Sequence, residues 1–597
     1  MRRSWATVGA AVLSVALGCD GSDGGSGGDT DGGESSGGAT SSSTASTSGT
    51  SQGTATSASS TGGDPSGSED GTGSTTTSAT SDDESSGGEE SSGTTGDPPS
   101  FDPEPAGGTF FGDSQFERIQ GVHVDEAGYI YLGGTTHSAN FPATPGAFQT
   151  SKNGPDGNAN QYQLSEGYVA KLSPDGSTIE WATFLGGSAR ESVYAVRTDS
   201  AGNVYAVGAT GSADFPTTAG AYDPTVNGPT GGASLGDAFV VRLSSDGSTM
   251  DFGTVVGGAG GGEENPRGSI VIDEEDDRLY VSGITASSNF PTTGGSLQPN
   301  YGGGANDGFV FALSLDGGTL LAATYLGGNG TDMAYSKVSL HPDGSVLVAG
   351  ATSSSNFPVT EGAFQPTLAS GGPSDNWYED GDAFVSRLSD DLSSLVFSSY
   401  LGGNDSDAVG HNQGMGVDSQ GRIVVAGSTS SSDFPVTAGA YAGSPSGGPD
   451  GFVAVIAEDG SSIAYATYVG GSDADNLSTM FVGPDDRVYV TGTIASDDWP
   501  VTADAMQPDF GNGTASGGVT DAVLTIFDPT LSSLEYSTYL GGSGSQGGAE
   551  RGRSVWATET AIYVAGATDS ADFPTLAPSV QPDYGGGVDG FLVWFTR

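Results

Sequence analysis

The sequence predicts an all-β protein, a seven-bladed β-propeller preceded by a disordered low-complexity linker. Two observations carry this prediction. A triplet of Asn or Asp, an aromatic residue and Pro recurs seven times, roughly 65 to 77 residues apart, and each interval divides into four short strands joined by turn residues. The triplets are Asn140-Phe141-Pro142, Asp214-Phe215-Pro216, Asn289-Phe290-Pro291, Asn356-Phe357-Pro358, Asp433-Phe434-Pro435, Asp498-Trp499-Pro500 and Asp572-Phe573-Pro574.

The four strands of a repeat differ in pattern. The first is amphipathic, and the second is almost wholly apolar, as in Val204-Tyr205-Ala206-Val207, which predicts burial on both faces. The third follows an acidic residue, and the fourth ends in a Gly pair, as in Tyr325-Leu326-Gly327-Gly328. Four antiparallel strands per repeat indicate a propeller blade.

The two ends of the repeat array predict closure of the ring. The chain finishes at residues 589–595 with a third strand that no fourth strand follows. Residues 109–113 resemble a fourth strand with no first three before it. If these strands pair, one strand from the N-terminal side and three from the C-terminus complete the seventh blade. This closure removes two exposed sheet edges.

The repeats resemble the SBBP repeat of bacterial β-propeller proteins. The resemblance is clearest at residues 400–407 (YLGGNDSD) and 433–441 (DFPVTAGAY) and covers about Thr109 to Arg597. The sequence departs from the repeat pattern at Trp499, which stands in place of Phe, and at Val255-Val256, where the aromatic residue of the fourth strand is missing. The resemblance implies a propeller fold and an exported or surface location, and it implies no activity.

The N-terminal region predicts export and anchoring. Residues 1–18 contain Arg2 and Arg3 and then a short apolar run, as in a signal peptide. Cys19, the only cysteine, follows Ala-Leu-Gly, which resembles a bacterial lipobox, although Ala16 stands where Leu is usual. An ordinary signal peptide with an incidental cysteine is the alternative.

Residues 19–106 are rich in Gly, Ser, Thr and Asp and almost free of apolar side chains, so we expect a disordered acidic linker. It would serve as a stalk below the propeller of residues 107–597, or be a tolerated insertion without a role. A formal net charge of −56 opposes a nucleic-acid partner, because phosphate binding requires Lys and Arg.

Loop lengths predict which face of the propeller binds a ligand. Turns between the first and second strands and between the third and fourth are short. The other connections are long, notably residues 153–166, 227–236, 370–381 and 512–520, and carry Tyr162, Trp377 and Tyr378. Long loops on a rigid scaffold are where binding usually resides.

An acidic residue opens the first strand of every repeat, so carboxylates could converge on the channel mouth. These acids are Glu117, Glu191, Glu264, Asp332, Asp407, Asp475 and Glu550. The densest part, Asp405, Asp407, Asp473 and Asp475, is a candidate Ca²⁺ site, because Ca²⁺ takes six to eight oxygen ligands. The alternative is a solvated rim, or carboxylates that accept backbone amides.

Two other repeated features predict structural roles. We expect the Asn or Asp of each triplet to close an Asx turn, and its aromatic ring to fill the gap between blades. We also expect the acid before each third strand to accept neighbouring backbone amides. This second set is Glu166, Asp237, Asp307, Asp382, Asp450, Asp521 and Asp589.

No residue pattern for catalysis occurs in the sequence. His123, His137, His341 and His411 lie in separate repeats without metal-ligand spacing. The sequence therefore favours a monomeric, non-enzymatic lipoprotein of the bacterial cell envelope that binds a surface polymer or protein. The alternatives are a secreted glycan-active hydrolase or lyase, which needs only two carboxylates about 5 to 9 Å apart, and a passive envelope protein.

Overall fold

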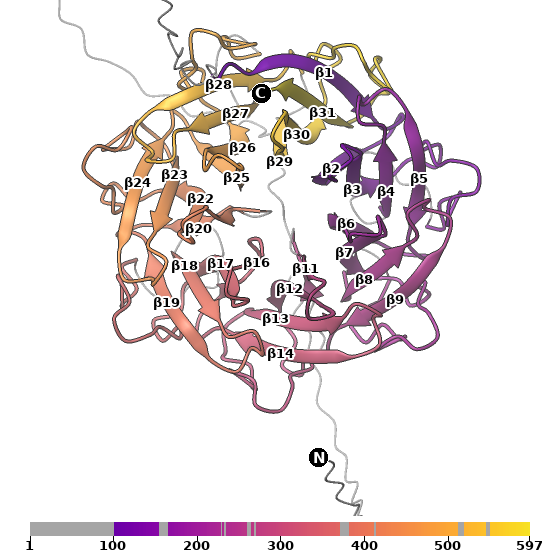
Figure 1. The fold of residues 1–597 in the computed structure, drawn as a ribbon, viewed down its shortest axis with the longest axis horizontal. Helices are drawn as coiled ribbons and strands as arrows, with labels where there is room; N and C mark the ends of the chain where they lie inside the picture. Colours follow the sequence, from indigo (N-terminus) through magenta and orange to yellow (C-terminus); the bar gives the residue numbers. More distant parts are fainter. Residues whose placement is uncertain are drawn as a thin grey trace, which may run out of the picture. The chain divides into compact units, whose positions relative to one another are not determined.

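The computed structural model describes residues 101–597 except 155–164, 229, 232–234, 260–263, 268–269, 371–380, 411–412, 512–518 and 545–549. These residues form 31 β-strands in seven sheets around one central channel (Figure 1). The predicted all-β, seven-bladed fold is confirmed. Within the described ranges there is no helix long and apolar enough to cross a membrane. The predicted signal peptide, Cys19 and residues 19–100 of the predicted linker lie outside the described residues.

Blades 1, 2 and 6 are continuous four-stranded antiparallel sheets, with the innermost strand named first. Blade 1 contains β2 (Glu117–Val124), β3 (Ile130–Thr136), β4 (Glu166–Leu172) and β5 (Ile179–Leu185). Blade 2 contains β6 (Glu191–Thr198), β7 (Val204–Thr210), β8 (Asp237–Leu243) and β9 (Met250–Val256). Blade 6 contains β25 (Asp475–Val482), β26 (Val488–Ile494), β27 (Ala522–Phe527) and β28 (Leu534–Leu540).

In blades 3 to 5 the innermost strand is split in two, and both parts pair with the second strand. Blade 3 contains β10 (Glu264–Asn265), β11 (Val271–Asp273), β12 (Arg278–Thr285), β13 (Asp307–Ser314) and β14 (Leu320–Leu326). Blade 4 contains β15 (Asp332–Met333), β16 (Ser339–Leu340), β17 (Val346–Thr352), β18 (Asp382–Leu388) and β19 (Leu395–Leu401). Blade 5 contains β20 (Asp407–Val409), β21 (Met415–Val417), β22 (Ile423–Thr429), β23 (Asp450–Ile456) and β24 (Ile463–Val469).

Blade 7 closes the ring as predicted, with three strands from the C-terminus and one from the N-terminal side. Its strands are β29 (Arg551–Ala557), β30 (Ala561–Thr568), β31 (Asp589–Thr596) and β1 (Glu104–Phe111). Strand β1 pairs antiparallel with β31 from Glu104↔Thr596 to Phe111↔Gly590. Because β1 begins at Glu104, the sheet includes the end of the segment predicted as linker and begins before residue 107.

Apolar side chains between the blades form the core. The second strand of a blade is buried on both faces, as every residue of β7 shows. Each triplet aromatic is also buried, and the ring of Phe357, for example, lies 4.4 Å from that of Phe384 on the third strand. Trp499 is buried as well, and its Nε1 donates to the hydroxyls of Thr525 and Ser537 at 3.2 Å. The predicted packing role of the aromatic residue is confirmed.

The triplet Asx contacts a distant loop rather than its own turn. The Oδ1 atom of Asp214 accepts from the backbone N–H of Ser188 at 2.8 Å, and Asp433 accepts from Asn404 at 2.9 Å. The expected local Asx turn is therefore wrong for these residues. A carboxylate at this position satisfies the amide that follows the Gly pair of the preceding fourth strand, and so it holds the loop between two blades.

Candidate ligand site in the central channel

Six of the seven predicted channel-mouth acids open the innermost strands, and Glu550 immediately precedes β29. The carboxylates of all of them except Glu264, whose side chain lies outside the description, turn into the blades. In Glu117, Oε1 accepts from the Thr136 hydroxyl at 2.9 Å, and Oε2 accepts from the Asp113 amide at 3.0 Å. At most 1% of each residue is exposed in Glu117, Glu191, Asp332, Asp407, Asp475 and Glu550. Glu264 opens β10 at the equivalent position. These six carboxylates therefore do not form a solvated rim, and they cap backbone and hydroxyl groups instead.

The predicted Ca²⁺ ligands do not point toward one another. Oδ2 of Asp407 accepts from the Gly403 amide at 2.7 Å, and Oδ2 of Asp475 accepts from the Gly471 amide at 2.7 Å. Asp405 and Asp473 are exposed instead. Among the described residues, no group of three or more His, Cys, Asp or Glu side chains is placed to hold a metal ion. Binding of Ca²⁺ by these four residues stays a prediction.

The acids before the third strands accept backbone amides, as predicted. Asp382 accepts from Ala369 at 2.8 Å and from Ser370 at 3.0 Å, and Asp521 accepts from Gly511 at 2.7 Å. Equivalent bonds are made by Glu166, Asp237, Asp307, Asp450 and Asp589. This set of acids is structural.

The two sets of acids meet in pairs at the blade junctions. A Cβ atom on Gly327 would lie 2.7 Å from Oδ1 of Asp307 and 2.8 Å from Oδ2 of Asp332, so only hydrogen fits between the two carboxylates. Burial, and after it the negative charge of Asp332, raises the pKa of Asp307 to about 7. Burial likewise raises the pKa of Glu191 to about 8 and of Asp521 and Asp589 to about 7.

Three of the four histidines lie in the described part, and they do not cluster. His341 lies in a turn, where its Nε2 is 3.2 Å from the Gly421 carbonyl oxygen and its Nδ1 is 2.8 Å from the Arg387 guanidinium. His123 lies on β2 and contacts Thr198, whereas His137 follows β3 and packs against Phe116. His411 lies outside the described residues. The histidines that can be placed are scattered, as the sequence predicted.

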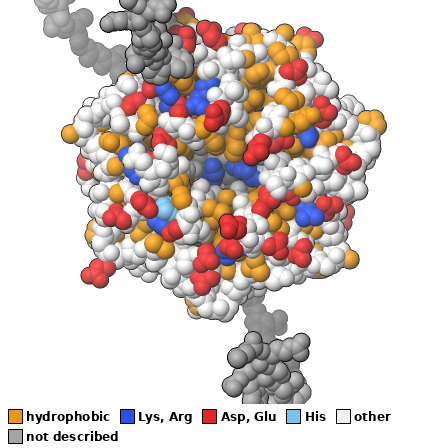
Figure 2. Space-filling view, viewed as in Figure 1, with side chains coloured by type: hydrophobic (Ala, Val, Ile, Leu, Met, Phe, Trp, Pro, Cys, Tyr) orange, Lys and Arg blue, Asp and Glu red, His pale blue; other side chains and the backbone are white. Residues whose placement is uncertain are grey.

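The innermost segments carry a set of basic residues that sequence reasoning missed. Seven of the 17 Lys and Arg residues lie there, and Figure 2 shows basic side chains in the hollow at the centre of the ring. Each of these cations lies on or next to the first strand of its repeat, so an alignment of the repeats would show them at similar positions. The seven are Arg118, Arg190, Arg197, Arg267, Lys337, Arg551 and Arg553.

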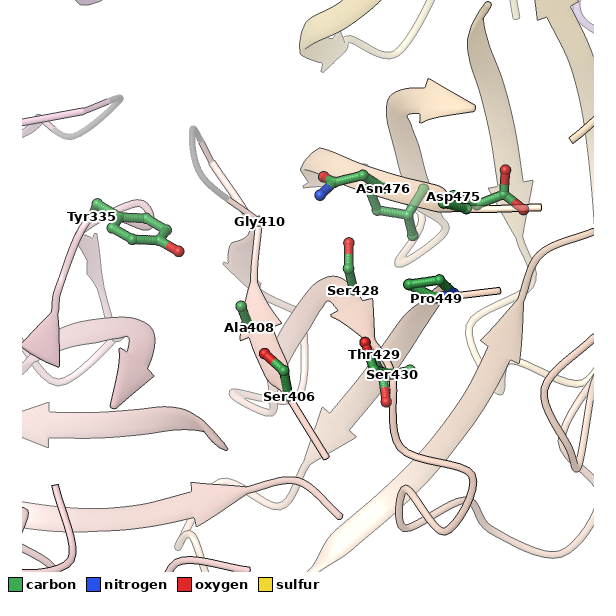
Figure 3. A pocket seen from close by; sticks show the side chains of 12 residues that line it. Tyr335, Ser406, Ala408, Gly410, Ser428, Thr429, Ser430, Pro449, Asp475 and Asn476 are labelled. Atoms are coloured by element: carbon green, nitrogen blue, oxygen red, sulfur yellow. The ribbon is translucent and has the colours of Figure 1, made fainter. Parts of the chain in front are cut away.

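A cavity of about 240 Å³ opens where the innermost strands of blades 4, 5 and 6 meet the long-loop face. Its lining includes Tyr335, Ser428, Ser430 and Asn476, and Figure 3 shows the Tyr335 hydroxyl pointing toward the strand of Ala408. Within the described ranges, the side chains of Ser428, Ser430 and Asn476 have no hydrogen-bond partner. The cavity therefore offers neutral hydrogen-bonding groups beside an aromatic ring.

The predicted contact residues Tyr162, Trp377 and Tyr378 lie outside the described residues.

Comparison with known proteins shows no family. No protein-family profile and no curated protein matches the chain. Among solved structures, a quinohemoprotein alcohol dehydrogenase from Comamonas testosteroni is 10% identical, with a TM-score of 0.40, over 83% of this chain and 76% of that one. Sqt1 from Chaetomium thermophilum is 9% identical, with a TM-score of 0.37, over 83% of this chain and 99% of its own. Similarities this low carry no argument about function.

Proposed function

We propose that the protein is a non-enzymatic propeller, lipid-anchored at the cell surface through Cys19, that binds a surface polymer or protein through its long-loop face. The cavity between blades 4 and 6 is the observation that carries this proposal. Its unpaired hydroxyl and amide groups and the ring of Tyr335 suit a polar, uncharged unit such as a sugar residue. The SBBP resemblance and the signal-like N-terminus support the surface location.

The hydrolase or lyase alternative requires a pair of carboxylates that a substrate can reach. The acid pairs at the blade junctions have raised pKa values, but residues such as Asp307 and Asp332 are fully buried beneath the Gly pair. They lie behind the backbone that a substrate would contact, so they give this alternative no support.

The proposal is tested with immobilised protein and a panel of purified envelope polysaccharides and proteins. We expect saturable binding that Asn476→Ala and Ser428→Ala weaken about tenfold each, because each variant removes a hydrogen bond in a confined site. Ser461→Ala, in a short turn on the opposite face, is the matched control and should bind as the wild type does. Equal binding by all variants would contradict the assignment of the cavity, and chain cleavage of a bound polymer would favour the enzymatic alternative.

A further inference from the structure

Side chains from six blades meet in one layer of the channel, near the ends of the innermost strands that face the short turns. Arg197 crosses this layer, because its Nη2 donates to Oε1 of Gln413 at 3.2 Å and so connects blade 2 with blade 5. The layer comprises His123, Arg197, Lys337, Gln413, Phe481 and Trp556.

Each of the two cations in this layer lies against an aromatic ring. The Arg197 guanidinium carbon lies 5.0 Å from the ring centre of Trp556, and the Lys337 ammonium lies 5.4 Å from that of Phe481. The two rings are 4.6 Å apart. Cation-π contacts of this kind hold a positive charge at a defined place without neutralising it.

Neither cation has a counter-ion among the residues that the structure places. In the part of the chain that the structure describes, no carboxylate lies within 4.0 Å of Arg197 or Lys337, although Arg278, Arg387, Arg422 and Arg487 each have one. The protein contains 73 acidic residues and 17 basic ones, so a basic side chain would readily find a partner almost anywhere else. Two adjacent positive charges without a counter-ion are costly where one is buried, as Arg197 is, and the other is partly buried, as Lys337 is.

The layer also holds a buried donor without an acceptor. Gln413 is fully buried, and the bond from Arg197 to its Oε1 orients the amide, yet its Nε2 has no hydrogen-bond partner among the residues that the structure describes. Within the same described part of the chain, the buried Nδ1 atom of His123 has none either. A buried polar atom without a partner destabilises the folded state, so the layer lacks a hydrogen-bond acceptor.

We propose that this layer binds a compact oxyanion, which is the carboxylate, phosphate or sulfate group of a ligand, through Arg197, Lys337 and the amide of Gln413. Oxygen acceptors with a negative charge would neutralise both cations and satisfy the unpaired Nε2. The rings of Phe481 and Trp556 form an apolar wall that keeps the charges poorly hydrated and strengthens the attraction. The lowered pKa of Lys337, to about 7 through burial and then through Arg197, fits two like charges without a counter-ion.

The test is titration calorimetry on the full-length protein carrying Cys19→Ser, which removes the predicted lipidation site. The probes are D-glucuronate, inorganic phosphate and sulfate, with glucose and chloride as controls at equal ionic strength. We expect at least one oxyanion to bind and neither control to do so, and the strongest probe distinguishes a carboxylate from a phosphate or sulfate ligand. Absence of binding by all three oxyanions would overturn the proposal.

Two variants locate the site. Lys337→Met should weaken binding at least tenfold, whereas Lys171→Met, which also removes a lysine stacked on aromatic rings but outside the channel, should not. Gln413→Glu should abolish binding, because the new carboxylate supplies a counter-ion from within the protein. Wild-type affinity in both channel variants would overturn the assignment.

A thermal melt without added anions checks that the variants fold. Lys337→Met should melt at or above the wild-type temperature, because it removes an uncompensated charge, and added oxyanion should no longer raise its Tm. An oxyanion-dependent rise in Tm equal to that of the wild type would contradict the proposal. This test does not depend on the proposed polymer binding, because it uses small anions and leaves the long-loop face unchanged.

Discussion

At the scale of the residue, paired acids explain why each fourth strand ends in two glycines. The first glycine, such as Gly327, lies between two carboxylates where a Cβ atom would not fit. The second, such as Gly328, donates its amide to the acid four residues later, at 2.6 Å from Asp332. The Gly pair and both acids therefore form one structural unit at a blade junction.

A neutral residue at such a pair should stabilise the protein above pH 7. In Asp307→Asn, the side chain can still accept from Gly302, and its amide group faces Asp332 in place of an unpaired oxygen. Because the pKa of Asp307 is about 7 in the folded protein and near 4 in the unfolded one, its burial costs stability increasingly from about pH 4 to pH 7, and the cost is larger at pH 8 than at pH 5. We expect the Tm to rise by about 2–4 °C at pH 8 and by less than half as much at pH 5, as followed by calorimetry.

Asp583→Asn is the control for this prediction, because Asp583 is exposed. Its Tm should match that of the wild type at both pH values. An equal rise for Asp307→Asn at pH 5 and pH 8 would show that charge is not the cause.

A glycine of the short turns should be intolerant of a side chain. Gly460 has a φ of 68°, and a Cβ atom there would lie 2.3 Å from the Phe397 ring. Gly460→Ala should therefore lower the free energy of unfolding by about 1–3 kcal/mol, which a denaturant titration measures. Gly443→Ala is the matched control, because nothing lies within 4 Å of a Cβ atom at that position, and it should be close to neutral.

At the scale of the element, β1 is the strand that closes the ring. It pairs with β31, and a Cβ atom on Gly107 would lie 2.0 Å from the Trp594 ring, so the two strands pack without space for a side chain there. Phe101, just before β1, contacts Arg487 of blade 6, with 4.2 Å from ring centre to guanidinium carbon. The N-terminal strand therefore joins blades 6 and 7.

Removal of β1 should open the ring. A chain that begins at residue 112 exposes the edge of β31 and should melt at a lower temperature or self-associate, as size-exclusion chromatography and calorimetry would show. A chain that begins at Phe101 is the control and should remain monomeric. Addition of a peptide of residues 101–112 should restore the Tm, and an unchanged Tm without β1 would contradict this account of closure.

At the scale of the whole molecule, acidic and basic side chains occupy different places. Acidic side chains pair at the blade junctions or lie on the surface, whereas basic side chains gather along the channel (Figure 2). Basic side chains in the channel of a protein of net charge −56 would favour small anions there, whereas the acidic remainder of the protein repels them.

The raised pKa values predict that stability falls as the pH rises from about 4 to 8. Glu191, Asp307, Asp521 and Asp589 titrate at about 7 to 8 in the folded protein but near 4 when unfolded, so over this range the folded state binds more protons. Their favourable contribution is complete below pH 4 and lost above pH 8.

Calorimetry should therefore find the Tm higher at pH 5 than at pH 8, by on the order of 10 °C. Acids with lowered pKa values, such as Asp316 and Asp391, act in the opposite direction only below about pH 4. A Tm that rises steadily from pH 5 to pH 8 would contradict the raised pKa values of the junction acids.

Much of the fold could be predicted from the sequence, because each blade repeats the same local signals. The seven triplets, the apolar second strands and the incomplete repeat at each end determined the number of blades and the closure through β1. The amide-accepting role of acids such as Asp382 also followed from their repetition, since a residue needed in every blade serves the fold.

The direction of each side chain was decided only by the tertiary structure. Repetition places Glu117 and Arg197 on innermost strands, but it does not say that the carboxylate turns into the blade while the guanidinium crosses the channel to Gln413. The contact between Arg197 and Gln413 joins two different blades across 216 positions of sequence, so it depends on how the strands twist about the axis. The sequence alone therefore determined the propeller, and packing around the ring decided that its centre is basic.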